Sequence, residues 1–195
     1  MEMTPDDTRP VRCAFKDTTG QTCDEPVHRD GLCYWHDDSA VKDEAELKQR
    51  LEEHAHNGTP MRYFKLRNTD LANIDLVNRH HSQGYQLHHA DFYRSDLRNA
   101  HLFGLDLSFS SLMKADLRGA NLHRVNLEHT NLLGIKLEHS KLEGVQWGER
   151  VRQEWQADHE TDAIKQRQLY SEAEEIYRSI GRVMRNQGMV ADLGN

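Results

Sequence analysis

The 195-residue sequence contains no long apolar run and no secretory leader. No segment approaches the roughly 18 consecutive apolar residues that a membrane-spanning helix needs. The first residues also lack the charged and apolar regions of a signal peptide. The sequence therefore predicts a soluble, cytoplasmic protein that does not insert into membranes, with room for one domain and attachments.

Catalytic motifs are also missing. The chain has no G-x-S-x-G, no phosphate-binding P-loop and no G-x-G-x-x-G, which are the patterns of nucleophilic hydrolases and nucleotide-binding enzymes. Since no side chains form a credible catalytic constellation, we expect a protein that is not an enzyme.

Cysteine is scarce, and the three cysteines fall in one short segment. An odd number does not suit a disulfide framework. Cys13, Cys23 and Cys33 are followed by His36 in a tight C-x-x-H pair, and three thiolates with one imidazole make a complete tetrahedral zinc set. We predict a structural Zn²⁺ at these four residues, with His28 as a possible substitute for His36. The alternative is three buried, reduced cysteines beside an exposed histidine.

The net charge of −7 is unevenly distributed. Residues 1–60 carry 7 basic and 14 acidic side chains, whereas residues 85–148 carry 7 of each. The acidic segment is the one that contains the cysteines, and phosphate contacts need clustered Lys and Arg. Direct binding of nucleic acid by that segment is therefore disfavoured.

A five-residue repeat dominates the middle of the chain. Its centres are Leu87, Phe92, Leu97, Leu102, Leu107, Leu112, Leu117, Leu122, Leu127, Leu132, Leu137, Leu142 and Trp147. Side chains alternate between faces along an extended chain, so each unit resembles a short strand followed by a turn. A helix would scatter these leucines, because five residues advance about 500° around its axis. Units this short bury a face only when they stack.

The units Ala115-Asp116-Leu117 and Ala120-Asn121-Leu122 resemble the A(D/N)LXX motif of the pentapeptide-repeat family. This resemblance implies a mainly β fold, a right-handed quadrilateral β-solenoid with four units per coil. Coils would lie about 4.8 Å apart. The implied vertical stacks are Leu87, Leu107, Leu127 and Trp147 on one side, and Phe92, Leu112 and Leu132 on the next.

Other periods flank the repeats. Residues 43–56 and 149–159 have helical patterns, and a longer amphipathic helix is predicted at about 160–186. The step of eleven from Leu76 to Leu87 predicts a bulge at 79–83 that absorbs one residue beyond two units. The apolar face of the last helix could cap the solenoid or form a homodimer. Its residues are Leu169, Ile176, Ile180 and Val183.

Two outward columns stand out in the repeats. Tyr93, Met113 and Leu133 follow successive centres of one side and would form an exposed apolar stripe, which often marks an interface. The alternative is that the terminal helix or tail covers this stripe. At a neighbouring corner Phe109 lies between His89 and His129. Solvated histidines are expected there in preference to a metal ladder.

These patterns divide the chain into five parts. We expect a disordered N-terminus at 1–10, a Cys3His zinc module at 11–38, a linker and capping helix at 39–60, a β-solenoid at 61–148, and a helical cap or dimerisation segment at 149–195. The module is too small to fold by apolar burial alone.

The predicted function is a non-catalytic scaffold for protein–protein interaction, with a partner that the sequence does not identify. Family resemblance suggests two alternatives. Some pentapeptide-repeat proteins resemble B-form DNA and protect DNA gyrase, but that mimicry needs a strongly negative rod, and the repeats here sum to zero. Others combine similar parts with membrane channel-like segments, in which case this chain would be a cytoplasmic sensing or assembly domain.

Overall fold

The computed structural model describes residues 11–81 and 83–189. The chain divides into two compact units, Met1–Val41 and Lys42–Asn195. Within the described residues no helix is long and apolar enough to cross a membrane. The expected disorder of residues 1–10 lies outside the described part, as does the end of the last predicted segment at 190–195.

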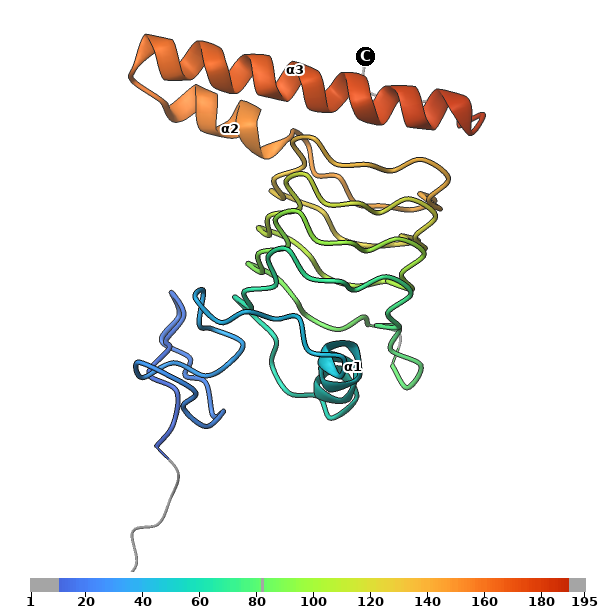
Figure 1. Cartoon of the computed structure of the whole chain (residues 1–195). Coiled ribbons are helices and arrows are strands. Elements are labelled where there is room, and N and C mark those ends of the chain that lie inside the picture. Colours follow the sequence, from blue (N-terminus) through green and yellow to red (C-terminus); the bar gives the residue numbers. More distant parts are fainter. Residues whose placement is uncertain (1–10, 82, 190–195) are drawn as a thin grey trace, which may run out of the picture. The chain divides into compact units, whose positions relative to one another are not determined.

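The repeats form a β-solenoid. Parallel bridges join residues twenty positions apart, as in Asp91↔Ser111 and Ser111↔Asn131, so four five-residue units complete one turn. Figure 1 shows these coils stacked between α1 and the two C-terminal helices. In the described solenoid every bridge is isolated, because each side is extended for only a few residues before it turns.

The predicted centres fill the interior of the solenoid. The twelve from Leu87 to Leu142 are at most 2% exposed, whereas Trp147 at the end is half-buried. Small hydroxyl side chains also point inward, and their donors are satisfied: Ser110 Oγ donates to the Leu87 carbonyl at 3.1 Å, and Thr130 Oγ1 to the Leu107 carbonyl at 2.7 Å. Hydrogen bonding removes the cost of burying these groups.

Asp and Asn recur before the centres because they close turns. The Asp91 carboxylate accepts the Tyr93 N–H at 3.0 Å, and the Asn131 side chain accepts the Leu133 N–H at 3.1 Å. Each turn then passes through a corner residue in the left-handed region, for example His89 with φ 60° and Phe109 with φ 58°. Asx turns of this kind stabilise a backbone that is otherwise unfavourable for L-residues.

The first coil differs from its prediction. Its bridges, Lys65↔Asp91 and Asp75↔His101, span 26 residues. The step from Leu76 to Leu87 is therefore a single side with six extra residues, and not two units with one extra residue. The interpretation was wrong because spacing alone does not show which side a leucine occupies. The same offset places buried Met61 beneath Leu87, as the first member of that stack.

Helix α1, Leu47–His56, lies at the open start of the solenoid. Its buried residues are Leu47, Leu51 and Ala55. Lys48 Nζ donates to the Ala72 carbonyl at 3.2 Å, and Glu52 accepts the Asp75 N–H at 2.8 Å. The helix therefore supplies both apolar cover and polar partners to the first coil, where an unprotected β edge would be exposed.

Helices α2, Arg152–His159, and α3, Ala163–Asn186, cover the other end. The Asp162 carboxylate caps α3 by accepting the N–H of Ile164 at 2.8 Å. Gln187 Nε2 donates to the Ser140 carbonyl at 2.7 Å. Of the predicted apolar face, Ile176, Ile180 and Val183 are buried within the chain, and Leu169 is half-buried. These residues are used for intramolecular packing, which leaves little apolar surface for a homodimer through this face.

Candidate metal centre and interaction surface

The first unit is a small set of turns joined by antiparallel bridges, Arg12↔Pro26, Lys16↔Thr22 and Arg29↔Leu32. A tight turn joins the first two cysteine-bearing segments. The Gly20 N–H donates to the Asp17 carbonyl at 3.0 Å, and the Asp17 carboxylate accepts the Thr19 N–H at 2.8 Å. This hairpin brings Cys13 and Cys23 toward the turn that contains Cys33.

The ligand atoms of Cys13, Cys23, Cys33 and His36 all lie within 4.8 Å of one another. The Cys33 sulfur is 3.2 Å from His36 Nδ1 and 3.8 Å from the Cys23 sulfur. A tetrahedron with Zn–S bonds of about 2.3 Å has S–S edges of about 3.8 Å, whereas a disulfide needs about 2.05 Å. The three thiols are free, and their arrangement suits a metal ion.

The surroundings restrict the access of water to this group. Cys13, Cys33 and His36 are buried and Cys23 is half-buried. The ring of Phe15 stacks on the His36 imidazole at 3.9 Å. His28, the possible substitute ligand, is exposed and packs its ring against Tyr34 at 5.6 Å. The structure thus brings together the four predicted ligands and leaves His28 outside the group.

The thiols are electrostatically coupled. The hydrogen bond to the Cys23 sulfur, helped by burial, raises the pKa of Cys33 to about 12. The same contact lowers the pKa of Cys23. The Cys33 thiol therefore stays protonated at neutral pH when no cation is bound, whereas a bound cation stabilises every thiolate that coordinates it.

The stripe of Tyr93, Met113 and Leu133 is aligned but only half-exposed. Backbone hydrogen bonds hold it in register, since Arg94 N–H donates to the Met113 carbonyl at 3.1 Å. The expected open apolar surface is partly covered by polar neighbours: the Arg94 guanidinium lies 5.2 Å from the Tyr93 ring centre, and Asn131 Nδ2 lies 3.9 Å from the Met113 sulfur. All three side chains are half-buried.

The neighbouring corner carries a continuous stack of rings. Tyr63 stacks on His89 at 4.4 Å, His89 on Phe109 at 5.0 Å, and Phe109 on His129 at 4.9 Å between ring centres. Trp155 of α2 continues the column, 6.0 Å from His129 and nearly perpendicular to it, and its ring also lies 4.6 Å from that of His159 on the same helix. Aromatic neighbours separate the two histidines, so this column does not form the metal ladder considered above.

The repeats are similar to known proteins in both sequence and structure. The family model described as pentapeptide repeats (8 copies) matches residues 86–119 and 120–146. The structure of alr5209, a pentapeptide repeat protein from Nostoc PCC 7120, is 30% identical over 53% of this chain and 74% of its own length, with a TM-score of 0.38. The chain belongs to the pentapeptide-repeat family.

Two further solved structures are similar to this pentapeptide-repeat protein. HetL, from the cyanobacterium Nostoc sp. strain PCC 7120 and involved in the regulation of heterocyst differentiation, is 31% identical over 45% of this chain, with a TM-score of 0.41; the chain spans only 38% of its length. QnrB1, a plasmid-mediated fluoroquinolone resistance protein, is 15% identical over 47% of this chain and 50% of its own, with a TM-score of 0.29. Curated proteins give no match.

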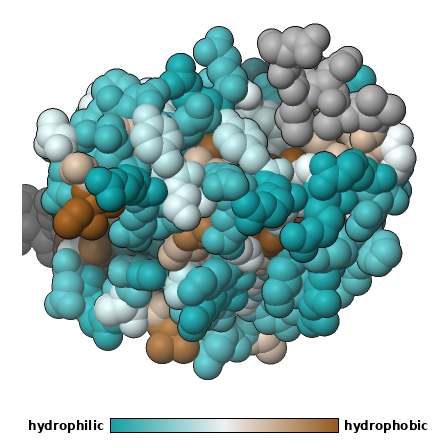
Figure 2. Space-filling view, turned by 90° about the horizontal axis from the view of Figure 1, so that it is seen from above, coloured by the Kyte–Doolittle hydropathy of each residue, from teal (hydrophilic) through white to brown (hydrophobic). Residues whose placement is uncertain are grey.

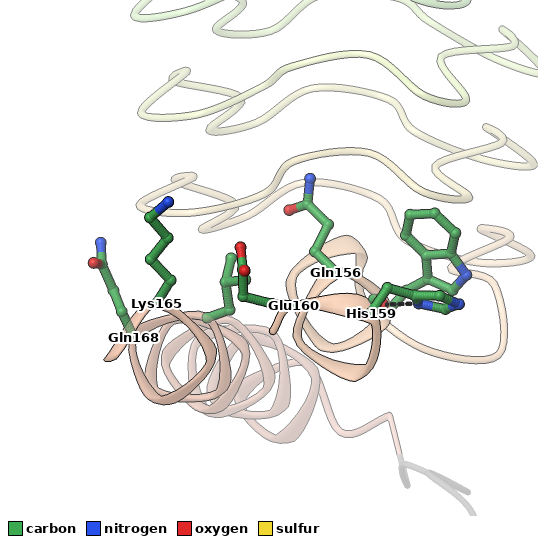
Figure 3. A pocket seen from close by; sticks show the side chains of 7 residues that line it. Gln156, His159, Glu160, Lys165 and Gln168 are labelled. Atoms are coloured by element: carbon green, nitrogen blue, oxygen red, sulfur yellow. Dashed lines mark hydrogen bonds between the residues drawn. The ribbon is translucent and has the colours of Figure 1, made fainter. Parts of the chain in front are cut away.

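Among the described residues, cavities border the C-terminal helices of this pentapeptide-repeat protein. One, of about 570 Å³, lies between α2 and the start of α3. Figure 3 shows Gln156 and His159 on α2 and Lys165 and Gln168 on α3, with Glu160 between the two groups. A smaller cavity, of about 290 Å³, lies beside the ring column.

Sequence reasoning missed two members of the ring column. Tyr63 lies 26 residues before His89, so the six-residue insertion hides it from a twenty-residue search. Trp155 belongs to a helix and has no place in the repeat register. A search for aromatic residues at corner positions on both sides of the insertion would have found the first but not the second.

Proposed function

We propose that this pentapeptide-repeat protein is a non-catalytic scaffold that binds a protein partner along the solenoid. The observation that carries the proposal is the alignment of Tyr93, Met113 and Leu133 on successive coils, held by backbone hydrogen bonds. The solenoid fold requires apolar side chains in its interior, but it does not require apolar side chains at the outward positions of Tyr93, Met113 and Leu133. An aligned and partly apolar column on a rigid support suits recognition of another surface.

We also infer that the Cys3His group binds one structural Zn²⁺. Three sulfurs and one imidazole nitrogen complete a tetrahedral shell and leave no open coordination position. The ion would hold together a unit whose described residues contain only short antiparallel bridges and turns. This use of the cysteines, as ligands and not as nucleophiles, agrees with a role that is not enzymatic.

The charge pattern favours the scaffold over mimicry of DNA. Asp96 and Asp116 lie on successive coils, where a DNA mimic would need unneutralised acid. Each carboxylate is held by an arginine two residues later, Asp96 by Arg98 and Asp116 by Arg118, both at 2.6 Å. Protection of DNA gyrase therefore has no supporting feature on this side. A sensing or assembly role in a channel-like protein is compatible with the scaffold proposal, but no feature of the described residues favours it over a general scaffold.

The experiment is quantitative affinity capture of proteins from the source cell. The test variant replaces Tyr93, Met113 and Leu133 by serine. The matched control replaces by serine Arg98, Arg118 and Glu138, which occupy the equivalent outward positions of the adjacent side. We expect the test variant to lose a protein that the control retains, with both folded by circular dichroism. Equal retention by both variants would contradict a partner site on this column.

A further inference from the structure

The side of the solenoid that carries Tyr93, Met113 and Leu133, named the stripe side, is also its most basic side. It consists of residues 64–68, 90–94, 110–114 and 130–134. Its charged residues are four basic ones and one acidic one, which are Lys65, Arg67, Arg94, Lys114 and Asp91. The whole solenoid, residues 61–148, carries 11 basic and 9 acidic side chains. With every acid counted at full charge, the stripe side contributes +3 and the other three sides together contribute −1.

The cations gather around the first residue of the apolar stripe. The guanidinium carbons of Arg67 and Arg94 lie 5.1 and 5.2 Å from the centre of the Tyr93 ring. Asp91 offsets part of this charge, because its carboxylate lies 3.4 Å from Arg67 Nε. Within the described part of the chain, Arg67 is the one basic residue of the stripe side that forms an ion pair. The Tyr93 ring is therefore the apolar centre of a positive region.

Lys114 extends this region to the next coil. It follows Met113 at the corner of the stripe side and is exposed. Its stem lies against the corner above, since a Cβ atom on Gly134 would be 3.2 Å from Lys114 Cγ. The corner column of Arg94 and Lys114 therefore places two exposed cations directly beside the apolar stripe.

Acids on the adjoining sides limit the width of the positive region. Asp96 and Asp116 lie just beyond the basic corner, each with its arginine at 2.6 Å. Glu128 lies beyond the opposite corner, 3.7 Å from His129. A long polyanion that covered the stripe side would also overlie these carboxylates, and its phosphates would be repelled there. The charge pattern therefore suits a short acidic segment better than a nucleic acid.

The spacing of the stripe indicates the form of this segment. Tyr93, Met113 and Leu133 lie on successive coils, which are about 4.8 Å apart. Successive turns of an α-helix are about 5.4 Å apart along its axis, whereas side chains on one face of an extended peptide are about 6.6 Å apart. A helix laid along the solenoid therefore keeps closer register with the three coils.

Other surfaces and occupants have less support. Figure 2, the view from above, shows a mainly hydrophilic face with separated apolar spots, so that face lacks the alignment of the stripe. A second copy of this chain is disfavoured on the stripe side, because two such sides placed face to face would oppose four cations to four.

We propose that the stripe side binds an acidic amphipathic helix of a partner protein. The apolar face of this helix packs along Tyr93, Met113 and Leu133. Its carboxylates face the basic corner of Arg94 and Lys114. The inference rests on the proposed scaffold function and deepens it by naming the chemistry and the form of the partner. Exposed charge pairs contribute little affinity, so the cations act mainly in selecting an acidic partner and in speeding its encounter.

Methionine methyl signals of the full chain, labelled with ¹³C at the ε-methyl group, provide the test. Met113 lies on the stripe side, whereas Met61 and Met184 are buried. The probe is the blocked peptide EALEELLEELEALEE, which places its leucines on one face of a helix. We expect a saturable shift of the Met113 signal, assigned by its loss in Met113→Leu, and no shift of Met61 or Met184. The affinity should fall as salt is added.

Two altered peptides separate charge from helical form. KALKKLLKKLKALKK reverses the charge, and EALEELPEELEALEE keeps the charge but breaks the helix with a proline. Each should bind about tenfold or more weakly than the first peptide. A DNA duplex should not displace the first peptide. Displacement by DNA, or equal binding of either altered peptide, would overturn the proposal.

Lys114→Glu should weaken the acidic peptide by about fivefold or more. Arg124→Glu is the matched control, because Arg124 is exposed at the equivalent corner of another side and has φ 58°, against 61° for Lys114. Equal effects of the two variants, or no shift of Met113 by the acidic peptide, would also overturn the proposal. If the peptide fails while affinity capture still depends on Tyr93, Met113 and Leu133, the scaffold proposal stands and its partner is not an acidic helix.

Discussion

The indole of Trp155 lies nearly perpendicular to the imidazole of His129, with ring centres 6.0 Å apart. This contact joins α2 to the last rung of the ring column. The same helix is tied to the coil by Gln153 Nε2, which donates to the Asn131 side chain at 2.7 Å. Helix α2 is therefore attached to this coil by an aromatic and a polar contact two residues apart in sequence, and the cap has in addition the hydrogen bond from Gln187 to the Ser140 carbonyl.

Trp155→Ala should loosen this attachment. Aromatic pairs contribute about 0.5–1.5 kcal/mol beyond the burial of their surface area. We therefore expect the variant to be about 1–2 kcal/mol less stable than wild type, as measured by thermal unfolding. Amide hydrogen exchange should increase in α2 while the inner coils stay protected. Tyr170→Ala is the control, because it also removes an exposed aromatic ring of the cap but none in the column. Equal changes in both variants would contradict a specific role for Trp155.

Zinc content tests the Cys3His group directly. Protein purified without added metal should contain about one zinc per chain, because the four ligands complete a structural shell. Cys33→Ser should lose the metal, and a strong chelator should unfold the first unit while the solenoid remains folded. The readouts are elemental analysis and Trp35 fluorescence. His28→Asn is the control and should retain the metal; loss in this variant would assign His28 as a ligand.

A charge in the solenoid interior should not be tolerated. The Leu117 side chain is fully buried, and Leu117→Asp would leave an unpaired carboxylate among leucines. We expect a loss of more than about 4 kcal/mol or failure to fold. Leu117→Met conserves volume and should cost less than about 1.5 kcal/mol. Urea denaturation compares the two variants, and a stable Asp variant would show that the interior admits water.

The pH dependence of stability should reveal the aspartate–arginine pairs. The hydrogen bond from Arg118 lowers the pKa of Asp116 below its ordinary 3.8. A carboxyl whose pKa is lower in the folded state than in the unfolded state stabilises the fold at pH values above its unfolded-state pKa. This contribution is lost as the pH falls through the folded-state pKa. Asp116→Asn keeps the turn acceptor, so it should cost up to about 1 kcal/mol at pH 7.

The difference in the free energy of unfolding between wild type and Asp116→Asn should decrease as the pH falls below about 3.8. Asp106→Asn is the control, since Asp106 closes the same turn with the Ser108 N–H at 3.0 Å and has no arginine partner among the residues that the structure describes. Chemical denaturation at several pH values measures both. A gap that stays constant with pH would exclude the ion pair as its cause.

The repeats explain which features the sequence can predict. The sequence predicts Leu117 in the interior, because an unbroken five-residue period puts the leucine of every unit on the same face. The structure confirms this position. Met61 lies five residues before Leu66 and fits the period, but its place beneath Leu87 was missed because the insertion after Val77 breaks the register between the first coil and the next. The contact between Trp155 and His129 depends on how a helix docks on a coil, which no local pattern encodes.

The six-residue insertion offers a strict test of the register. Leu76 and Val77 begin the last side of the first coil, and Gln86 pairs with Asp106 at the regular separation of twenty. A Cβ atom on Gly84 would lie 1.9 Å from the Gly104 carbonyl oxygen, so Gly84 lies against the glycine corner of the next coil. Removal of residues 78–83 would join Val77 directly to Gly84.

The join would produce Leu76-Val77-Gly84-Tyr85-Gln86, a complete five-residue unit with glycine at its corner. We expect this deletion to fold with stability within about 1 kcal/mol of wild type, because shorter loops lose little closure entropy. Removal of only five residues, 79–83, is the control. It leaves one residue too many and shifts inward side chains outward, so it should destabilise the first coil. The opposite order of stabilities in thermal unfolding would contradict the assignment of residues 78–83 as the inserted segment.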